Sequence, residues 1–430
     1  MPGEPDFGAE LRRRRENAGI SLTELGVRVH YSKGHLSKIE SGQKAPTVQL
    51  ARLCDAAVGA EGDLLRLVAD GVVAGAPARE LDAVERDGWT LGVTPGGAGF
   101  FVPGGEQVPK ETEFGMTFGD RATYSGEVAT LAGMFWSRFE TARRLGQVAG
   151  PAVVLPGVIA DTQTLRGVAS NASQEDRPVL WRLAARYAEF AGWMTQEAGD
   201  DRMALWWTET AVRMAVLGGD HSLSTYALVR QADVALHAAD ALTTISLARQ
   251  AQFDERIPAR IRGLAAQREA QGHALAGDHV ACRRALDLSA ELLGAAEARD
   301  GTPELGTTHT PDLSVLVGGW CLYDLGLPAE AAEVLDRGVA RFAPDAHRSR
   351  ARYVTRAALA YGTAGELDRA CELMTSVLDH LHLIDSATIR HDLRQLTQVL
   401  ARRRNHAVAR EVRQRLVTVL RTPGGAPATR

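Results

Sequence analysis

Small residues recur at nearly constant intervals along the C-terminal two thirds of the chain. The residues that define the period are Gly199, Ala239, Gly277, Gly326 and Gly365, separated by 40, 38, 49 and 39 positions. Small residues also stand seven positions before them (Gly192, Ala232, Ala270, Gly319, Ala358) and five positions after them (Ala204, Thr244, Cys282, Ala331, Ala370). Paired helices need small residues where they touch. The pattern therefore predicts a run of helix pairs from about residue 122 onward.

This period resembles the tetratricopeptide repeat, whose unit is about 34 residues long. The longer unit here predicts helices that are longer by roughly one turn. The 49-residue interval holds a polar insertion at 298–311, and Ala409 marks a degenerate sixth unit. We therefore expect a tetratricopeptide-like α-solenoid at residues 121–421, serving as a sensor and dimerisation domain, and a disordered tail at 422–430.

In tetratricopeptide proteins the first helix of each pair lines the concave face. The resemblance implies that the first helices of the pairs in this chain line a concave face as well. The residues on that face mix aromatic rings, amides and both charges, which suits a peptide or a small-molecule effector. They are Arg186, Glu189, Trp193, Gln196, Tyr226, Asp233, His237, Gln267, Gln271, Trp320, Tyr323 and Arg352. The alternative is that these side chains are ordinary wet surface or inter-helix packing.

A second pattern, at residues 21–46, predicts two short helices joined by a tight turn. Ser21 stands three residues before a glutamate, which is a helix start signal. The helix that follows has apolar residues at i, i+3 and i+7, which form one buried stripe. Ser32 then caps a second helix over residues 33–40.

This stretch resembles the XRE family, which includes phage repressor and Cro domains, in Ser21-Leu22-Thr23-Glu24-Leu25, in Leu36-Ser37-Lys38-Ile39-Glu40-Ser41-Gly42 and in Pro46. The resemblance implies a five-helix helix-turn-helix bundle at residues 1–70, so the fold class is all-α. The family pairs an arginine of helix one with the glutamate that closes helix three, here Arg15 and Glu40. The turn departs from the family pattern, because His30 and Tyr31 replace the usual glycine and small aliphatic residue.

The outward side chains of the 33–40 helix suit base edges in the major groove of double-stranded DNA. Lysine donates to guanine, histidine donates or accepts, serine reads more weakly, and glycine lets the backbone approach. The predicted DNA-binding residues are Ser32, Lys33, Gly34, His35, Ser37 and Lys38, with Ser21, Thr23, Ser41, Gln43 and Lys44 for the phosphate backbone. The alternative for the lysines is a solvated face.

Charge and composition agree with a protein that reads DNA locally. The 430-residue chain has a net charge of −4, yet residues 7–68 hold ten Lys or Arg against seven Asp or Glu. A protein that recognises a DNA sequence needs a basic patch on its DNA-binding domain, and here the excess of basic residues is confined to residues 7–68. No apolar run is long enough for a membrane helix, and the N-terminus is unlike a signal peptide. We therefore expect a cytoplasmic protein without membrane contact.

Residues 71–120 are rich in Gly and Pro but also contain aromatic residues, which a solvated linker does not normally carry. We predict a short hairpin from residues 89–93 and 100–102, turned at Pro95-Gly96-Gly97, and expect the segment to dock on the helical domain. The alternative is a mobile linker.

Motifs of the common enzyme classes are absent from the sequence: it holds no G-x-x-x-x-G-K-[ST], G-x-G-x-x-G, G-x-S-x-G or H-E-x-x-H. His380 and His382 face different sides of a predicted helix, so with His391 they do not suggest a metal site. The four cysteines, Cys54, Cys282, Cys321 and Cys371, lack ligand spacing and are expected in cores. We therefore expect no enzyme activity, no cofactor and no metal.

Together these features predict a sequence-specific bacterial transcription regulator. The layout resembles the quorum-sensing regulators of Gram-positive bacteria, in which a signalling peptide enters the solenoid. That resemblance implies a homodimer on a palindromic operator, since one head buries too little surface for strong specificity. The alternative is a protein-interaction adaptor whose head is a weak DNA anchor.

Overall fold

The computed structural model describes residues 7–29, 33–44 and 46, single positions between 50 and 67, three strands between 89 and 118, and residues 124–295, 305–306, 313–343, 345–403 and 405–421. The chain divides into two compact units, Met1–Ala83 and Val84–Arg430. Among the described helices, none has the length and apolar character needed to cross a membrane.

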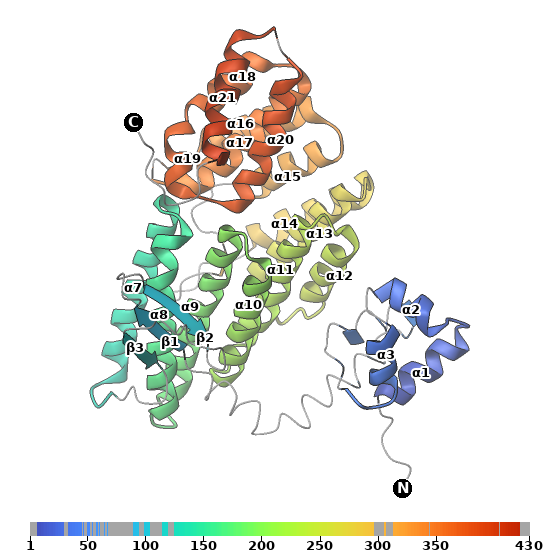
Figure 1. Cartoon of the computed structure of the whole chain (residues 1–430), viewed down its shortest axis with the longest axis vertical. Coiled ribbons are helices and arrows are strands. Elements are labelled where there is room, and N and C mark those ends of the chain that lie inside the picture. Colours follow the sequence, from blue (N-terminus) through green and yellow to red (C-terminus); the bar gives the residue numbers. More distant parts are fainter. Residues whose placement is uncertain are drawn as a thin grey trace. The chain divides into compact units, whose positions relative to one another are not determined.

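Unit 1 is built on three helices, α1 (Phe7–Asn17), α2 (Leu22–Val29) and α3 (Lys33–Glu40) (Figure 1). Each contributes a fully buried leucine to one core, namely Leu11, Leu25 and Leu36. The turn at His30, Tyr31 and Ser32 lies outside the described residues. Most of the predicted fourth and fifth helices lies outside them too, although Leu50, Cys54 and Leu64 are buried in the same core.

Unit 2 begins with a three-stranded antiparallel sheet in the order β2-β1-β3. Strand β1 (Trp89–Val93) pairs with β2 (Gly99–Pro103) on one side and with β3 (Phe114–Phe118) on the other. The β1–β2 hairpin confirms the predicted one, whereas β3 was not predicted, and it lies against α8 (Pro151–Asn171). The all-α class therefore describes the helical parts of both units, and the sheet is an addition to it.

The rest of unit 2 is helical and forms a solenoid of packed pairs (Figure 1). After α7 (Val128–Val148) and α8, the helices are α9 (Arg177–Ala198), α10 (Asp201–Leu217), α11 (His221–His237), α12 (Ala241–Gln252), α13 (Ala259–Leu275), α14 (His279–Gly294), α15 (Leu313–Asp324), α16 (Pro328–Val339), α17 (His347–Ala364), α18 (Leu367–Thr375), α19 (Leu378–Ile384), α20 (Ala387–Ala401) and α21 (Ala407–Arg421).

The five period-defining residues each end the first helix of a pair in the left-handed conformation. Their φ angles are 90°, 57°, 75°, 79° and 99° for Gly199, Ala239, Gly277, Gly326 and Gly365. The amide of the following residue donates back to the first helix in every case, as from Asp200 to the Thr195 carbonyl. This is the Schellman cap, which glycine favours. The predicted helix-pair repeat is therefore confirmed, and its period is the spacing of these caps.

The recurring small residues lie where the two helices of a pair meet. Ala232, Ala270 and Ala358 are fully buried. A Cβ on Gly319 would lie 2.7 Å from Cγ of Leu335 on the second helix of that pair. Because a larger side chain would separate the helices, these positions set the inter-helix distance.

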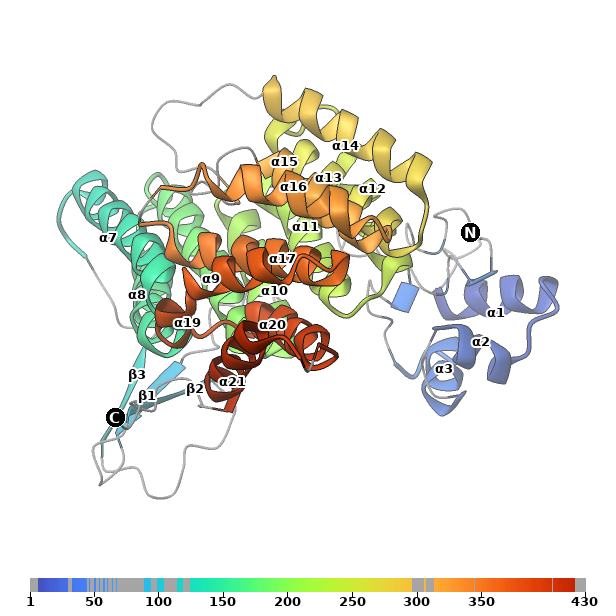
Figure 2. The ribbon, with the colours of Figure 1, turned by 90° about the horizontal axis from the view of Figure 1, so that it is seen from above.

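The run of pairs closes on itself. Helices α17 and α19 contact α7, and α20 contacts α9, so the last pairs lie against the first helices of the unit (Figure 2). A closed superhelix has an enclosed inner face, and the first helices α9, α11, α13, α15 and α17 contribute to it.

Replacing Ala239 with glycine should stabilise unit 2. A non-glycine residue in the left-handed region costs roughly 1–2 kcal/mol. Glycine opposes this gain, because it loses more conformational entropy on folding, by roughly 0.5–1 kcal/mol. We therefore expect denaturant titration to show an unfolding free energy that is higher by about 0.5–1 kcal/mol. The matched control is Gly277→Ala, whose Cβ would meet no described atom within 4 Å; it should destabilise by about 1 kcal/mol. Equal effects of the two substitutions would contradict the assignment of the cap.

Candidate functional site

The outer face of α3 presents a row of exposed polar residues. Lys33, Gly34, Ser37 and Lys38 are exposed, while the inner Leu36 is fully buried. The residues predicted to flank this face on the DNA backbone are exposed as well, namely Ser21, Thr23, Ser41, Gln43 and Lys44. Ser32 and the side chain of His35 lie outside the described residues. The structure thus gathers the described members of the predicted set around one helix.

A buried ion pair fixes α3 to α1. Arg15 donates from Nε to Oε1 of Glu40 at 2.6 Å and from Nη2 to Oε2 at 2.9 Å, and its Nη1 donates to the Ile20 carbonyl at 3.0 Å. The side chains are only 10% and 7% exposed. The Glu40 bond raises the pKa of Arg15 against the opposing effect of burial. The pair predicted from the sequence therefore sets the angle at which the outer face of α3 is presented.

Both ends of the helix-turn-helix segment are capped by short-range contacts. The Ser21 hydroxyl accepts a hydrogen bond from the Glu24 amide at 3.1 Å, which caps α2. Gly42 has a φ of 70° after α3, and the Gln43 amide donates to the Lys38 carbonyl at 2.9 Å. The backbone around Ser41 and Gln43 is therefore held close to the exposed face.

The arginine run of α1 is engaged within unit 1. Arg12 pairs with Glu16, and both Arg13 and Arg14 pair with Glu10. Arg14 also donates to the Ala60 carbonyl at 3.2 Å. The lysines of α3, by contrast, form no ion pair with any described residue and are exposed, so the charge on the outer face of α3 is not neutralised within the described part of unit 1.

Unit 2 encloses a cavity of about 130 Å³ on its inner face. Seven of the twelve predicted groove residues line it: Arg186, Glu189, Trp193, Tyr226, Asp233, Trp320 and Arg352. They come from four first helices that are far apart in sequence. The closed solenoid therefore brings most of the predicted set into one site.

The other five predicted residues lie outside the lining. Gln196 accepts a hydrogen bond from Arg230, Gln271 accepts one from Arg268, and His237 lies between Asp233 and Arg352, so these three support side chains that line the cavity. Gln267 is 1% exposed and packs inside the solenoid. Tyr323 contacts Thr363. Three of them therefore hold side chains that line the cavity, Gln267 and Tyr323 lie outside the lining, and a ligand role for the five stays a prediction.

Several lining residues were not predicted. Four are arginines, Arg143, Arg230, Arg268 and Arg348, and others are Phe139, Gln147, Phe190, Ser349 and Tyr353. Arg230 and Asp233 are three residues apart and so lie on one face of α11. This spacing could have identified Arg230 from the sequence. No local signal pointed to α7, which precedes the first repeat and reaches the site by packing on α9, where Phe139 contacts Phe190.

One carboxylate, Asp233, is the centre of the charged side of the cavity. Its Oδ2 lies 3.2 Å from Nη1 of Arg230, and its Oδ1 lies 3.2 Å from Nη2 of Arg268. Burial alone would raise the pKa of Asp233, but the positive charges of Arg268 and Arg230 lower it. Asp233 is therefore a permanent anion shared by two arginines.

Among the described residues, no group of three or more His, Cys, Asp or Glu side chains could hold a metal ion.

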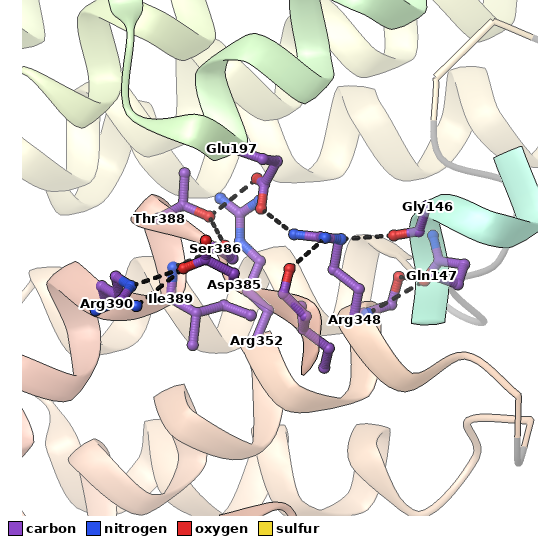
Figure 3. A network of polar contacts seen from close by, with 12 residues as sticks. Gly146, Gln147, Glu197, Arg348, Arg352, Asp385, Ser386, Thr388, Ile389 and Arg390 are labelled. Atoms are coloured by element: carbon purple, nitrogen blue, oxygen red, sulfur yellow. Dashed lines mark hydrogen bonds and ion pairs between the residues drawn. The ribbon is translucent and has the colours of Figure 1, made fainter. Parts of the chain in front are cut away.

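A second charged centre joins the ends of the solenoid (Figure 3). Arg348 of α17 donates to Oε2 of Glu197 on α9 at 2.8 Å. It also donates to the carbonyls of Gly146 and Ala149 at the end of α7 and of Ile384 at the end of α19, at 2.6–2.7 Å. Burial would raise the pKa of Glu197, but Arg348 lowers it. Because every Arg348 contact crosses between helices, this arginine has a structural role.

The family model described as "Helix-turn-helix domain" matches residues 6–68. No curated protein matches the chain. Among solved structures, a Rap protein complexed with Competence and Sporulation Factor is similar at 13% sequence identity and a TM-score of 0.41, over 67% of this chain and 98% of that chain. Residues 6–68 are therefore a helix-turn-helix domain, and the same chain contains the solenoid of paired helices described above.

Proposed function

We propose that the protein is a sequence-specific transcription regulator of the XRE type, whose α3 enters the major groove of DNA and whose solenoid binds an effector. The observation that carries this proposal is the outer face of α3, which is exposed, lysine-bearing and braced from behind by the Arg15–Glu40 pair. A helix that reads bases has to be both accessible and rigidly held. The face of α3 meets both requirements.

The effector part of the proposal rests on the cavity. Its lining combines aromatic rings with charged groups on the inner face of unit 2, which is the usual character of a site for a peptide or small molecule. We further propose that the protein is a bacterial, cytoplasmic homodimer on a palindromic operator, because two half-sites about 34 Å apart supply the specificity that one head lacks.

Selection from a pool of random duplexes tests the regulator function directly. The full-length protein should enrich one sequence family, and Lys33→Ala or Lys38→Ala should relax the preference at one or two base pairs, each worth about 1–3 kcal/mol. Lys44→Ala is the matched control, since loss of a phosphate contact weakens binding equally for all sequences.

Two outcomes would contradict this proposal. Equal retention of all duplexes would favour an adaptor that uses its solenoid to hold a protein and its head as a weak anchor. Unchanged base preference in both lysine variants would exclude α3 as the reading helix.

A further inference from the structure

The lining of the cavity carries more positive than negative charge. Of the described residues that line it, six are arginines, Arg143, Arg186, Arg230, Arg268, Arg348 and Arg352, and three are carboxylates, Glu189, Glu197 and Asp233. Arg348 and Glu197 neutralise each other in the structural network. Arg143 pairs with Glu140 at 3.2 Å. Four arginines, Arg186, Arg230, Arg268 and Arg352, therefore share Glu189 and Asp233 on the cavity wall. Burial lowers the pKa of Arg186, with Glu189 opposing that shift and Arg143 adding to it.

His237 is neutral and does not change the charge balance of the cavity wall. Its Nδ1 lies 2.8 Å from the Asp233 carbonyl oxygen, so Nδ1 carries the proton. Its Nε2 lies 3.1 Å from Nη2 of Arg352 and therefore accepts a hydrogen bond from that arginine. Burial lowers the pKa of His237, which keeps the ring neutral. His237 therefore does not neutralise the positive charge of Arg352. The Cζ atom of Arg352 lies 5.2 Å from the centroid of the Trp320 ring.

Buried donors without a hydrogen-bond partner outnumber such acceptors around Asp233, where Oδ1 of Asp233 is the one acceptor of this kind in the described part of unit 2. Nε of Arg230 and Nε of Arg268 are buried and have no hydrogen-bond partner among the described residues, and the same holds for Nε2 of Gln196 and Nε2 of Gln271. Arg230 is only 7% exposed, yet it lines the cavity. Buried donors are costly unless an acceptor reaches them. A ligand with acceptor oxygens and negative charge would satisfy both imbalances.

The remainder of the wall is apolar and limits what such a ligand looks like. Aromatic rings and aliphatic chains line it, among them Phe190, Trp193, Tyr226, Leu264, Val317 and Trp320. The volume of about 130 Å³ is slightly less than that of a cavity of roughly 150 Å³ that holds benzene. The site therefore suits one ring-sized apolar group, and the rest of a ligand extends toward its open side.

We propose that the cavity binds a carboxylate attached to a small apolar body, held by Arg230, Arg268 and Arg352. This proposal rests on the effector role proposed above and names the chemistry of the effector. The carboxylate comes from either of two sources, the C-terminal residue of a peptide or a free small acid. In both cases the arginines bind the carboxylate and the aromatic wall binds the body.

Calorimetric titration of the full-length protein tests this with paired probes. One pair is phenylacetate and phenylacetamide, and the other is a set of tripeptides ending in Phe or Leu as free acids and as C-terminal amides. In at least one pair the acid should bind at least about tenfold more tightly than the amide, since charge-assisted hydrogen bonds are the strong ones. The pair that shows the difference identifies the source.

Arg268→Gln should lower the affinity of the acid by at least about tenfold, and it should fold, because this side chain is already 22% exposed. The matched control is Arg249→Gln, an arginine 61% exposed and paired with Glu269 away from the cavity lining, which should bind as the unaltered protein does. Equal binding of acid and amide, binding of neither acid, or unchanged acid binding in Arg268→Gln would overturn the proposal. Duplex selection is independent of these titrations, so a failure of DNA reading is distinguishable from a failure of acid binding.

Discussion

Arg348→Ala should destabilise unit 2 by about 3–5 kcal/mol. The substitution leaves Glu197, whose side chain is 3% exposed, as a buried charge without its guanidinium. It also removes the donor from three carbonyls at the ends of α7 and α19. Each unpaired buried acceptor adds to the loss, because water does not readily replace the arginine there. Denaturant titration followed by far-UV circular dichroism should show an earlier transition for unit 2.

Arg138→Ala is the matched control for this effect. Arg138 also forms a two-pronged pair with a carboxylate, Asp161, but its side chain is 61% exposed. The Arg138 guanidinium is mostly in water while the Asp161 side chain is 13% exposed, so the pair is screened on one side and its loss should cost about 1 kcal/mol. A loss in Arg348→Ala no larger than that in Arg138→Ala would show that the Arg348–Glu197 pair does not hold the ends of the solenoid together.

The repeat could be predicted from the sequence because its determinants are local. A left-handed cap such as Gly199 needs glycine or a tolerant residue, and a helix crossing such as that at Gly319 needs a small one, so each requirement leaves a mark at a fixed spacing. The outer and inner faces of α3 follow from helical periodicity in the same way. These parts of the fold and of the α3 face required no knowledge of distant contacts.

The closure of the solenoid could not be predicted, because it depends on the summed twist of successive pairs. Arg348 meets Glu197 across 151 residues, and no short pattern marks either side chain for the other. Arg143 lines the cavity from α7, which packs on α9 and also contacts α17. The cavity brings together predicted residues of four first helices and adds arginines that were not predicted, whereas Gln267 and Tyr323 lie outside its lining. That this groove binds an effector stays a prediction.

Glu40→Ala should destabilise unit 1 by about 3 kcal/mol, since it leaves the buried Arg15 guanidinium with only the exposed carboxylate of Glu16, 3.5 Å away, as a counter-charge. The guanidinium side chain is 10% exposed and is held between α1 and α3, so it cannot reach water without disturbing the helix that bears the DNA-binding face. Thermal unfolding should show an earlier loss of unit 1, and affinity for the selected operator should fall as the temperature rises. The matched control is Glu24→Ala, which breaks the exposed Arg28–Glu24 pair and should leave both properties nearly unchanged.

The combination of stability and binding separates this bracing role from base reading. Lys38→Ala changes a side chain on the outer face of α3, so it should weaken operator binding at every temperature without changing the unfolding of unit 1. Glu40→Ala should bind the operator close to normally at low temperature, where α3 is still folded, and lose binding only as unit 1 unfolds. If Glu40→Ala lost binding while unit 1 stayed as stable as in the unaltered protein, Glu40 would act at the DNA and not as the brace of α3.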